Sequence, residues 1–192
     1  MRLQPTNRFD VIADPEILAS FEVIREVTNG ITIDYTKVPA DADGNKIIRI
    51  GMPVSKITAS GKFRPYTTNK LAANIAANAT TATFVDPIQW IVGDVLKFDN
   101  GSANENVTIL TINQTTKAIT FAAITNAYTT ANGIIATADG GETPTVILKR
   151  SVNVKDGDHV VGGYEVVKVI KERIPVTVDA ALIAKMPHVV FA

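Results

Sequence analysis

Apolar and polar residues alternate along both ends of the chain, and this period of two is typical of half-buried β-strands. Residues 23–35 (VIREVTNGITIDY) and 162–178 (GGYEVVKVIKERIPVTV) show the alternation most clearly. The dipeptide Asn29-Gly30 separates two β-rich runs, and Asn-Gly readily adopts the positive φ angles that a tight hairpin turn requires. We therefore predict one β-hairpin at Asn29-Gly30 and another at Gly162-Gly163.

Helix signals are few. Asp14-Pro15-Glu16 combines a capping side chain, a proline at the first helical position and an acid in the first turn, so it predicts a helix of one or two turns. Asp179 predicts the start of a second helix over 180–186, which Pro187 ends before the apolar tail 188–192. The expected fold class is therefore mainly β with minor α.

Charged residues are distributed unevenly. Residues 73–134 hold only six charged side chains, and about half of the residues in this stretch are Thr, Ala or Asn. Their ends, 69–81 and 129–144, are rich in small and polar residues, as exposed junctions tend to be. The sequences on either side mix both charges with alternating Val and Ile. We therefore expect 73–134 to be an insert, and 14–72 with 135–192 to form one discontinuous domain, the flanking domain.

The insert contains four short apolar runs separated by turn signals. The runs are 82–86 (ATFVD), 94–98 (DVLKF), 106–112 (NVTILTI) and 117–121 (KAITF). Asp86-Pro87, Asn100-Gly101 and residues 113–116 (NQTT) lie between them as turn sequences. Strands of this length and spacing predict a small antiparallel β-barrel or sandwich. A unit of about 60 residues is marginal alone, so it should lean on its host domain or on a neighbouring copy.

Composition excludes several classes of partner. The formal net charge is zero, whereas proteins that bind nucleic acid or anionic membranes usually present clustered Lys and Arg, so we expect neither partner. Cysteine is absent, which removes disulfides, thiolate nucleophiles and thiolate metal sites. Residues 1–13 lack the apolar core of a signal peptide, and no run approaches the roughly 20 apolar residues that span a bilayer. We expect the protein to be made and used without crossing a membrane.

The residues that usually carry chemistry are sparse. His159 and His188 stand in unlike contexts and lack evident partners for metal binding or acid–base work, so we interpret them as structural or surface residues. Residues 41–46 (DADGNK) resemble part of a calcium loop, but Gly44 comes too early and Met52 occupies the place of the closing glutamate. A solvated turn is the simpler interpretation. We expect no enzyme, no cofactor and no metal.

Two further features have both a structural and a functional interpretation. Trp90 is the only tryptophan, and it is either a ligand platform or interface of the insert, or a residue of its core. The cluster Lys168, Lys171 and Arg173 is either a solvated strand face or a patch that docks on a partner.

Three stretches of the flanking domain carry a recognisable order of short elements, namely 47–66 (IIRIGMPVSKITASGKFRPY), 147–175 (ILKRSVNVKDGDHVVGGYEVVKVIKERIP) and 178–192 (VDAALIAKMPHVVFA). In these stretches the flanking domain resembles the lambda-type head decoration proteins of tailed bacteriophages. In that family a strand ends at a glycine, a segment crosses over, further strands surround a DGD corner, and a short helix precedes a terminal apolar strand. The resemblance implies the decoration-protein β-fold, interrupted here by the insert.

The resemblance also implies a function. Family members bind the outer surface of the expanded capsid, typically as trimers at threefold or quasi-threefold positions, and clamp neighbouring major capsid subunits. The partners implied are the phage major capsid protein and further copies of the chain, and the location is the virion surface after assembly in the host cytoplasm. We expect residues 1–13 to form a capsid-binding arm that is extended or disordered in the free protein, with the insert projecting outward. The arm residues singled out are Met1, Arg2, Leu3, Gln4, Pro5 and Phe9. The alternative is a tail or fibre-base module that binds glycan or another protein through the insert.

Overall fold

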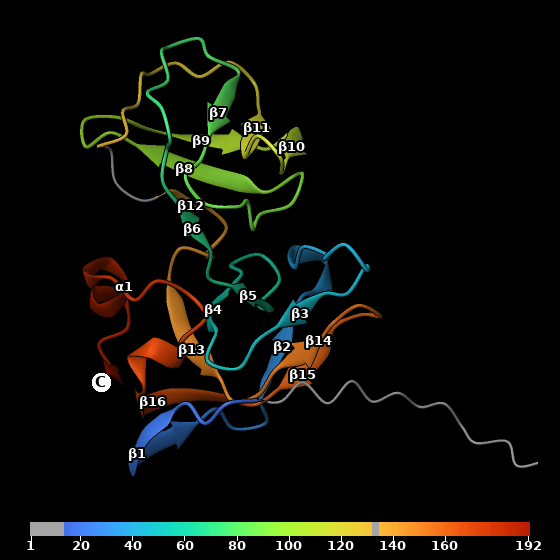
Figure 1. Ribbon diagram of the computed structural model, residues 1–192, viewed down its shortest axis with the longest axis vertical. Helices are drawn as coiled ribbons and strands as arrows, with labels where there is room; N and C mark the ends of the chain where they lie inside the picture. The colour runs from blue at the N-terminus through green and yellow to red at the C-terminus, as the bar shows by residue number, and fades with distance from the viewer. Residues whose placement is uncertain (1–13, 132–134) are drawn as a thin grey trace, which may run out of the picture.

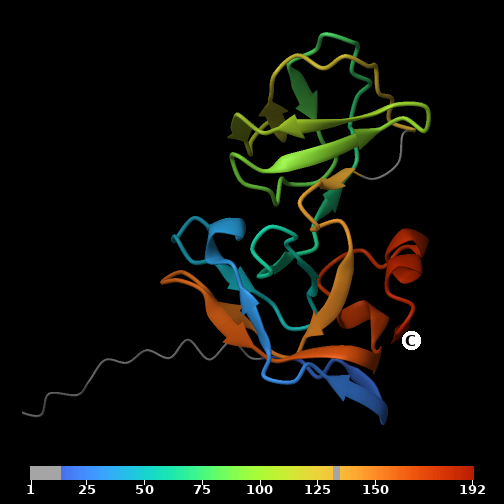
Figure 2. The same ribbon diagram turned by 180° about the vertical axis from the view of Figure 1, so that it is seen from behind.

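A computed structural model describes residues 14–131 and 135–192 and shows a mainly β protein with one short α-helix, as predicted. Figures 1 and 2 show two lobes, with the insert at one end of the molecule and the flanking domain at the other. The strands of the flanking lobe are β1 (Leu18–Glu26), β2 (Ile31–Ile33), β3 (Ile47–Ile48), β4 (Pro53–Lys56), β5 (Phe63–Pro65), β13 (Pro144–Leu148), β14 (Val152–Asn153), β15 (His159–Val161), β16 (Gly163–Val169) and β17 (Val189–Phe191). The other strands are β6 (Thr68–Asn69), β7 (Thr81–Thr83), β8 (Val95–Asp99), β9 (Asn104–Thr108), β10 (Thr111–Asn113), β11 (Ala118–Thr120) and β12 (Ile135–Thr137). The helices are the 3-10 turns η1 (Tyr35–Lys37) and η2 (Lys171–Arg173) and the α-helix α1 (Ala180–Lys185).

An eight-stranded mixed sheet forms the flanking lobe. Its order is β1-β16-β13-β4-β5-β2-β15, and β17 also pairs with β16, in parallel. Only Gly162 separates β15, the last strand of this order, from β16, which lies next to the first strand. The sheet therefore curls back on itself. A separate two-stranded sheet pairs β14 with β3.

The two predicted hairpins are wrong, and one arrangement explains both errors. β1 pairs with β16 and β2 pairs with β15, so residues 18–33 run antiparallel to 159–169 as one long ladder. Asn29 and Gly30 do adopt positive φ and form a turn in which the amide of Gly30 donates to the carbonyl of Val27 at 3.2 Å. This turn is a bulge in the ladder, because residues 27–30 stand opposite Gly162 and Gly163, and the amide of Val27 donates to the carbonyl of Gly163 at 2.9 Å. The local turn signal thus holds, but pairing with distant segments decides the partners of the strands on either side of it.

One helix prediction is wrong and the other is confirmed. No helix follows Asp14, because its carboxylate accepts hydrogen bonds from the amide and hydroxyl of Ser151 and the chain enters β1 four residues later. Asp179 caps α1 as predicted, with its Oδ1 accepting from the amide of Leu182 at 2.8 Å. The apolar tail after α1 forms β17.

The flanking lobe has two hydrophobic cores, one on each face of its sheet. β13 contributes to both, because alternate side chains of a strand point to opposite faces: Ile147 packs into one core, and Val146 and Leu148 into the other. Leu182 and Met186, from α1 and its C-terminal cap, cover the first core. The second core lies within the curled sheet.

The insert has a core of its own. β7, β11 and β10 form one antiparallel sheet, and β8 and β9 form a hairpin at Asn100-Gly101, as the turn signal predicted. Phe98 is fully buried and makes edge-to-face contacts with Phe121 and Tyr128, at centroid distances of 5.7 and 5.4 Å. This cluster begins at Leu71 and ends at Ile135, just outside the predicted limits of 73 and 134.

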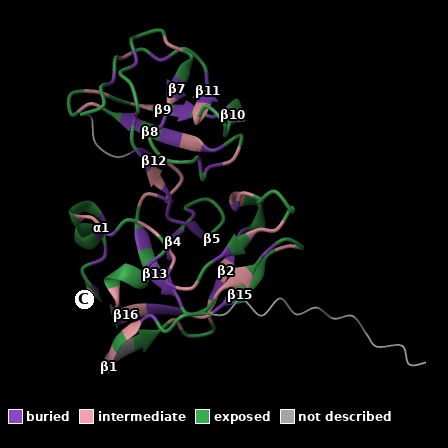
Figure 3. Ribbon diagram, in the orientation of Figure 1, coloured by how far each residue is buried: buried purple, intermediate pink, exposed green. Residues whose placement is uncertain are grey.

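Two short strands connect the lobes. β6 leads into the insert and β12 leads out of it, and the two strands pair with each other, with Ile135 opposite Asn69. β12 also pairs with β8, so the connection continues into a sheet of the insert. Asn69, Ala136 and Thr137 are buried, whereas the sequence suggested exposed junctions here, and Figure 3 shows buried residues running through this connection. The lobes are therefore joined by paired strands and not by free linkers.

Candidate functional site

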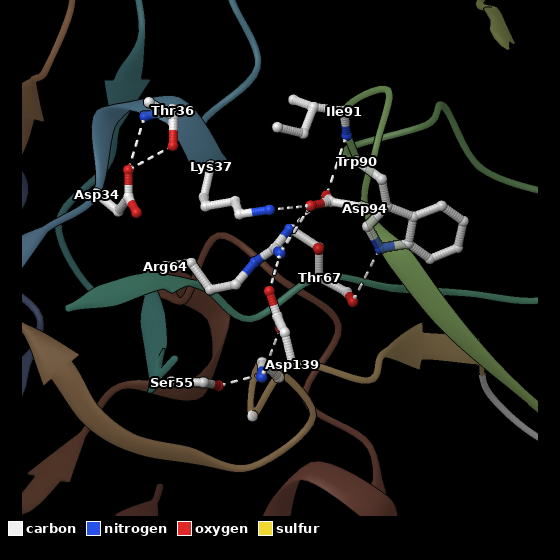
Figure 4. Close-up of polar contacts among 12 residues, drawn as sticks. Asp34, Thr36, Lys37, Ser55, Arg64, Thr67, Trp90, Ile91, Asp94 and Asp139 are labelled. Atoms are coloured by element: carbon white, nitrogen blue, oxygen red, sulfur yellow. Dashed lines mark hydrogen bonds and ion pairs between the residues drawn. The ribbon is translucent and has the colours of Figure 1, made fainter. Parts of the chain in front are cut away.

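A buried cluster of charges lies where the two lobes meet (Figure 4). Arg64 on β5 of the flanking lobe forms a two-pronged ion pair with Asp94 of the insert, at 3.0 and 2.6 Å. Its Nη1 also donates to Asp139 at 2.7 Å, and Lys37 in η1 donates to Asp94 at 2.9 Å. The side chains of Arg64 and Asp94 are 1% and 0% exposed. The cluster fixes the insert against its host through charge-assisted bonds in which both oxygens of the carboxylate accept.

The electrostatics of this cluster favour the charged forms. Burial alone would raise the pKa of Asp94, but hydrogen bonds and charge from Arg64, together with a hydrogen bond from Lys37, outweigh it and hold the pKa below its ordinary value. Burial would likewise lower the pKa of Arg64, and Asp94 and Asp139 raise it instead. The attraction between the two groups therefore offsets the cost of burying their charges.

Trp90 belongs to the core of the insert at this same junction. It is 2% exposed, packs edge-to-face on Phe84 at 5.1 Å, and its Nε1 faces the backbone oxygen of Thr67 at 3.4 Å. Thr67 lies just before β6, so the indole joins the insert to the connecting strands. With both faces covered by protein, the ring offers no platform on which a sugar could stack.

A groove of about 490 Å³ opens beside the charge cluster, and we call it the junction groove. Residues from both lobes line it. They include Ile47, Ile48, Arg49 and Thr67 of the flanking domain and connection, and Ile88 and Gln89 of the insert. Its lining mixes buried aliphatic side chains with amides and single charges, which is the composition of a binding site for a partly apolar ligand.

The three basic residues singled out in the sequence lie near one another, and we call them the basic patch. Lys168 on β16 and Lys171 and Arg173 in η2 are all exposed. Lys168 stands beside Val190 of β17, which is 55% exposed. The guanidinium of Arg173 donates to the backbone oxygen of Glu16, so the patch borders the segment that follows residues 1–13.

The arm residues themselves, Met1, Arg2, Leu3, Gln4, Pro5 and Phe9, lie outside the described residues. Their expected role as a capsid-binding arm stays a prediction.

The other residues weighed as candidates are not brought together. His159 and His188 are both exposed, on β15 and just before β17 respectively. In residues 41–46, Asp41 Oδ1 accepts from the amides of Asp43 and Asn45, so this carboxylate closes its own turn. Within residues 14–131 and 135–192, no three His, Cys, Asp or Glu side chains are grouped so as to hold a metal ion.

Sequence reasoning missed the charge cluster. Two signals pointed to it: Arg64 stands alone in the apolar run FRPY, and Asp94 is one of only six charged residues in the insert. Neither signal identifies the partner, because the two residues meet only through the fold.

Comparison of the chain with protein-family models, with curated proteins and with solved structures finds no match. No helix among the described residues is long and apolar enough to cross a membrane.

Proposed function

We propose that this chain is a structural virion protein that binds the outer surface of the expanded capsid of a tailed bacteriophage. It docks through the flanking domain and the arm formed by residues 1–13, and the insert projects outward. It assembles as trimers at threefold or quasi-threefold positions and stabilises the shell by clamping major capsid subunits. This function rests on the resemblance to lambda-type decoration proteins.

The observation that carries the proposal is the polarity of the molecule. Residues 1–13 join the described chain at Asp14, whose carboxylate accepts a hydrogen bond from Ser151. The basic patch lies beside this start of the described chain, because Arg173 donates to the backbone oxygen of Glu16. Figure 1 shows β1, β16 and the C-terminus at the end of the molecule remote from the insert. A shell bound at that end would contact the arm and the patch together, and the insert would face solvent.

β1 supplies a surface for self-association. Among the described strands it pairs only with β16, which leaves its other edge open. An open edge can accept a strand from a neighbouring copy or from the capsid, with main-chain hydrogen bonds providing the affinity. If three arms engage one site, their weak contacts reinforce each other through a high effective concentration. Binding only the expanded shell would stabilise that state by linkage.

The direct test mixes purified protein with emptied expanded capsids, with immature capsids and with a glycan panel. Retention on expanded capsids alone supports the proposal. Retention on glycans alone favours a tail or fibre-base module, an alternative that loses its strongest residue because Trp90 is buried. A capsid reconstruction with copies isolated from every threefold position would contradict the trimer.

A second test removes the insert. Asn69 and Ile135 are paired across β6 and β12, so a short Gly-Ser turn can join them in place of residues 70–134. The variant also needs Arg64→Met, because deletion removes Asp94 and leaves Arg64 without its main partner. Expanded capsids should still retain it. Loss of binding by a folded variant would show that the insert faces the shell.

A further inference from the structure

The tip of the β8–β9 hairpin places an amide side chain beside the peptide nitrogen of a glycine. Asn100 and Gly101 lie in the turn that the amide of Asn100 closes by donating to the carbonyl of Ala103, at 3.0 Å. In an Asn-Gly pair the glycine nitrogen can attack the side-chain carbon Cγ of the asparagine and close a five-membered ring, because glycine has no side chain to obstruct the approach. The groups around the pair decide how fast this happens in a folded protein.

The glycine nitrogen has a base in contact with its proton. The amide of Gly101 donates to Oδ1 of Asp99 at 2.8 Å. An amide nitrogen becomes a good nucleophile only as it loses its proton, and a carboxylate within hydrogen-bonding distance can accept that proton during the attack. The Asp99 side chain is 49% exposed, so solvent can afterwards restore its state. Asp99 is therefore placed to act as the base.

The side-chain carbonyl of Asn100 is held by two donors. Its Oδ1 accepts from the amide of Ser102 at 3.0 Å and from the amide of Ala103 at 2.7 Å. Attack on Cγ moves negative charge onto this oxygen, and backbone amides aimed at such an oxygen stabilise that charge, as in the oxyanion hole of an acyl-transfer enzyme. The leaving nitrogen, Nδ2, donates to the backbone oxygen of Ala127 at 3.1 Å.

The turn also has room to move. Ring closure requires the peptide between Asn100 and Gly101 to rotate toward the side chain. Gly101 and Ser102 are exposed, and no atom of the described residues, apart from its two chain neighbours, would lie within 4 Å of a methyl group at Gly101. An exposed hairpin end opens locally at a small fraction of the cost of global unfolding. The rotation therefore displaces no packed neighbour.

The other Asn-Gly pair among the described residues lacks both the base and the room. The amide of Gly30 donates to the carbonyl of Val27 at 3.2 Å, and a peptide carbonyl is too weak a base to take its proton. A methyl group at Gly30 would lie 2.9 Å from the carbonyl oxygen of Val161, so this glycine is packed against β15. The same dipeptide thus occurs once in an open turn with a base and once in a closed turn without one.

We propose that Asn100 is a site of self-catalysed modification, at which the chain converts this asparagine to aspartate and isoaspartate. The Gly101 nitrogen bonds to Cγ of Asn100 and gives its proton to Asp99. The Cγ–Nδ2 bond breaks, and Nδ2 takes up that proton and departs as ammonia, which leaves a succinimide. Water then opens either of the two bonds between the ring nitrogen and its carbonyl carbons, and nothing is oxidised or reduced. The inference concerns the isolated chain and does not depend on the proposed function.

The modification changes both charge and shape at the hairpin tip. The formal net charge of the chain falls from zero to minus one, because a neutral amide becomes a carboxylate. The new carboxylate lies beside that of Asp99, and like charges so close repel each other. The isoaspartate product in addition lengthens the backbone of the turn by one carbon atom. Both changes alter the surface that the insert presents.

Ageing of the full-length protein at neutral pH tests the inference. Trypsin cleaves after Arg25 and Lys37 and after Lys97 and Lys117, so Asn29 and Asn100 fall in separate peptides whose conversion mass spectrometry can follow. Synthetic copies of the two peptides give the rates without the fold. We expect Asn100 to react in the folded chain at least as fast as in its free peptide, and Asn29 to react about tenfold more slowly than in its own. Slower reaction of Asn100 in the fold than in the peptide overturns the proposal.

Matched variants test the base. Asp99→Ala should slow the reaction of Asn100 about tenfold or more. Lys97→Ala removes only the ion-pair partner of Asp99, at 3.7 Å, and should leave the rate unchanged. Amide NMR signals of β8 and β9 show whether each variant keeps the hairpin. An unchanged rate in Asp99→Ala with the hairpin intact overturns the proposal, and the comparison of the native chain with its peptides decides the matter if that variant fails to fold.

Discussion

The insert and the flanking domain are built from the same kind of element but held together differently. In the insert, hairpins pair residues close in sequence, such as Val95 with Thr108, and the core gathers five aromatic rings. In the flanking domain, Leu18 pairs with Val169 on the far side of the insert, and the two cores are mostly aliphatic. The insert thus draws on local contacts, whereas the flanking domain requires both ends of the chain.

This difference explains how one domain tolerates another within it. The insert closes its own core, and its entering and leaving strands pair with each other, so the host sheet is interrupted at one place only. The lobes are then joined by a few strong contacts, of which the Arg64–Asp94 pair is the most deeply buried. The predictions below probe, from the largest expected effect to the smallest, how separate the two regions are.

Asp94→Ala should have the largest effect, because it leaves the buried guanidinium of Arg64 without its two-pronged partner. We expect the free energy of unfolding, measured in urea, to fall by about 3–5 kcal/mol. Asp86→Ala, at an exposed carboxylate of the same insert, should change it by less than about 0.5 kcal/mol.

The double variant Arg64→Met with Asp94→Ala tests whether the loss comes from an unpaired charge. Replacing both partners by apolar side chains removes the uncompensated charge, so most of the lost stability should return. A double variant as unstable as Asp94→Ala alone would show that the pair itself, and not the stranded charge, provides the stability.

Phe98→Ala should remove a ring from the centre of the insert core and cost about 3 kcal/mol. Because the described residues of that core all lie between Leu71 and Ile135, outside the flanking sheet, the damage should be local. Hydrogen exchange should increase in β8, β9 and β11 and stay unchanged in β13 and β16. Equal increases in both lobes would show that the two cores unfold as one unit.

Lowering the pH should reduce the contribution of the Arg64–Asp94 pair to the free energy of unfolding. The pKa of Asp94 lies below its ordinary value of 3.8 in the folded protein, since the bonds from Arg64 and Lys37 outweigh the effect of burial. The pair therefore stabilises the fold fully above that ordinary value, and its contribution is lost as the pH falls through the lower folded pKa. The difference in free energy of unfolding between Asp94→Ala and the native chain should narrow from about pH 5 to about pH 2. A constant difference over that range would contradict the role of the charged carboxylate.

The same contrast between local and distant contacts explains which predictions from the sequence were confirmed and which were wrong. Asn100-Gly101 makes the hairpin that its dipeptide signals, and Asp179 caps the helix that follows it. Asn29-Gly30 carries the same signal but lies in a bulge, because its flanking strands pair with β15 and β16. Asp14 looks like a cap, yet its carboxylate bonds to Ser151. Local chemistry holds unless a distant partner offers more contacts.

The candidate site follows the same rule. For the basic patch and for Trp90 the sequence left two interpretations open, and the structure shows that Lys168, Lys171 and Arg173 are exposed and that Trp90 is buried. The Arg64–Asp94 pair and the junction groove were not readable, since each is assembled from both lobes. Only a fold brings those residues together.

The smallest expected effect is the difference in stability lost when alanine replaces the glycine of each Asn-Gly site. Gly30 and Gly101 both have positive φ, 74° and 82°, so an alanine at either site strains the backbone by about 1 kcal/mol. A methyl group at Gly30 would in addition lie 2.9 Å from the carbonyl oxygen of Val161, whereas at Gly101 no atom of the described residues, apart from its two chain neighbours, would lie within 4 Å of it. Gly101→Ala should therefore cost about 1 kcal/mol in urea unfolding and Gly30→Ala clearly more. Equal costs would mean that the bulge can shift away from β15, and that the long ladder of the flanking domain is less tightly closed than its hydrogen bonds indicate.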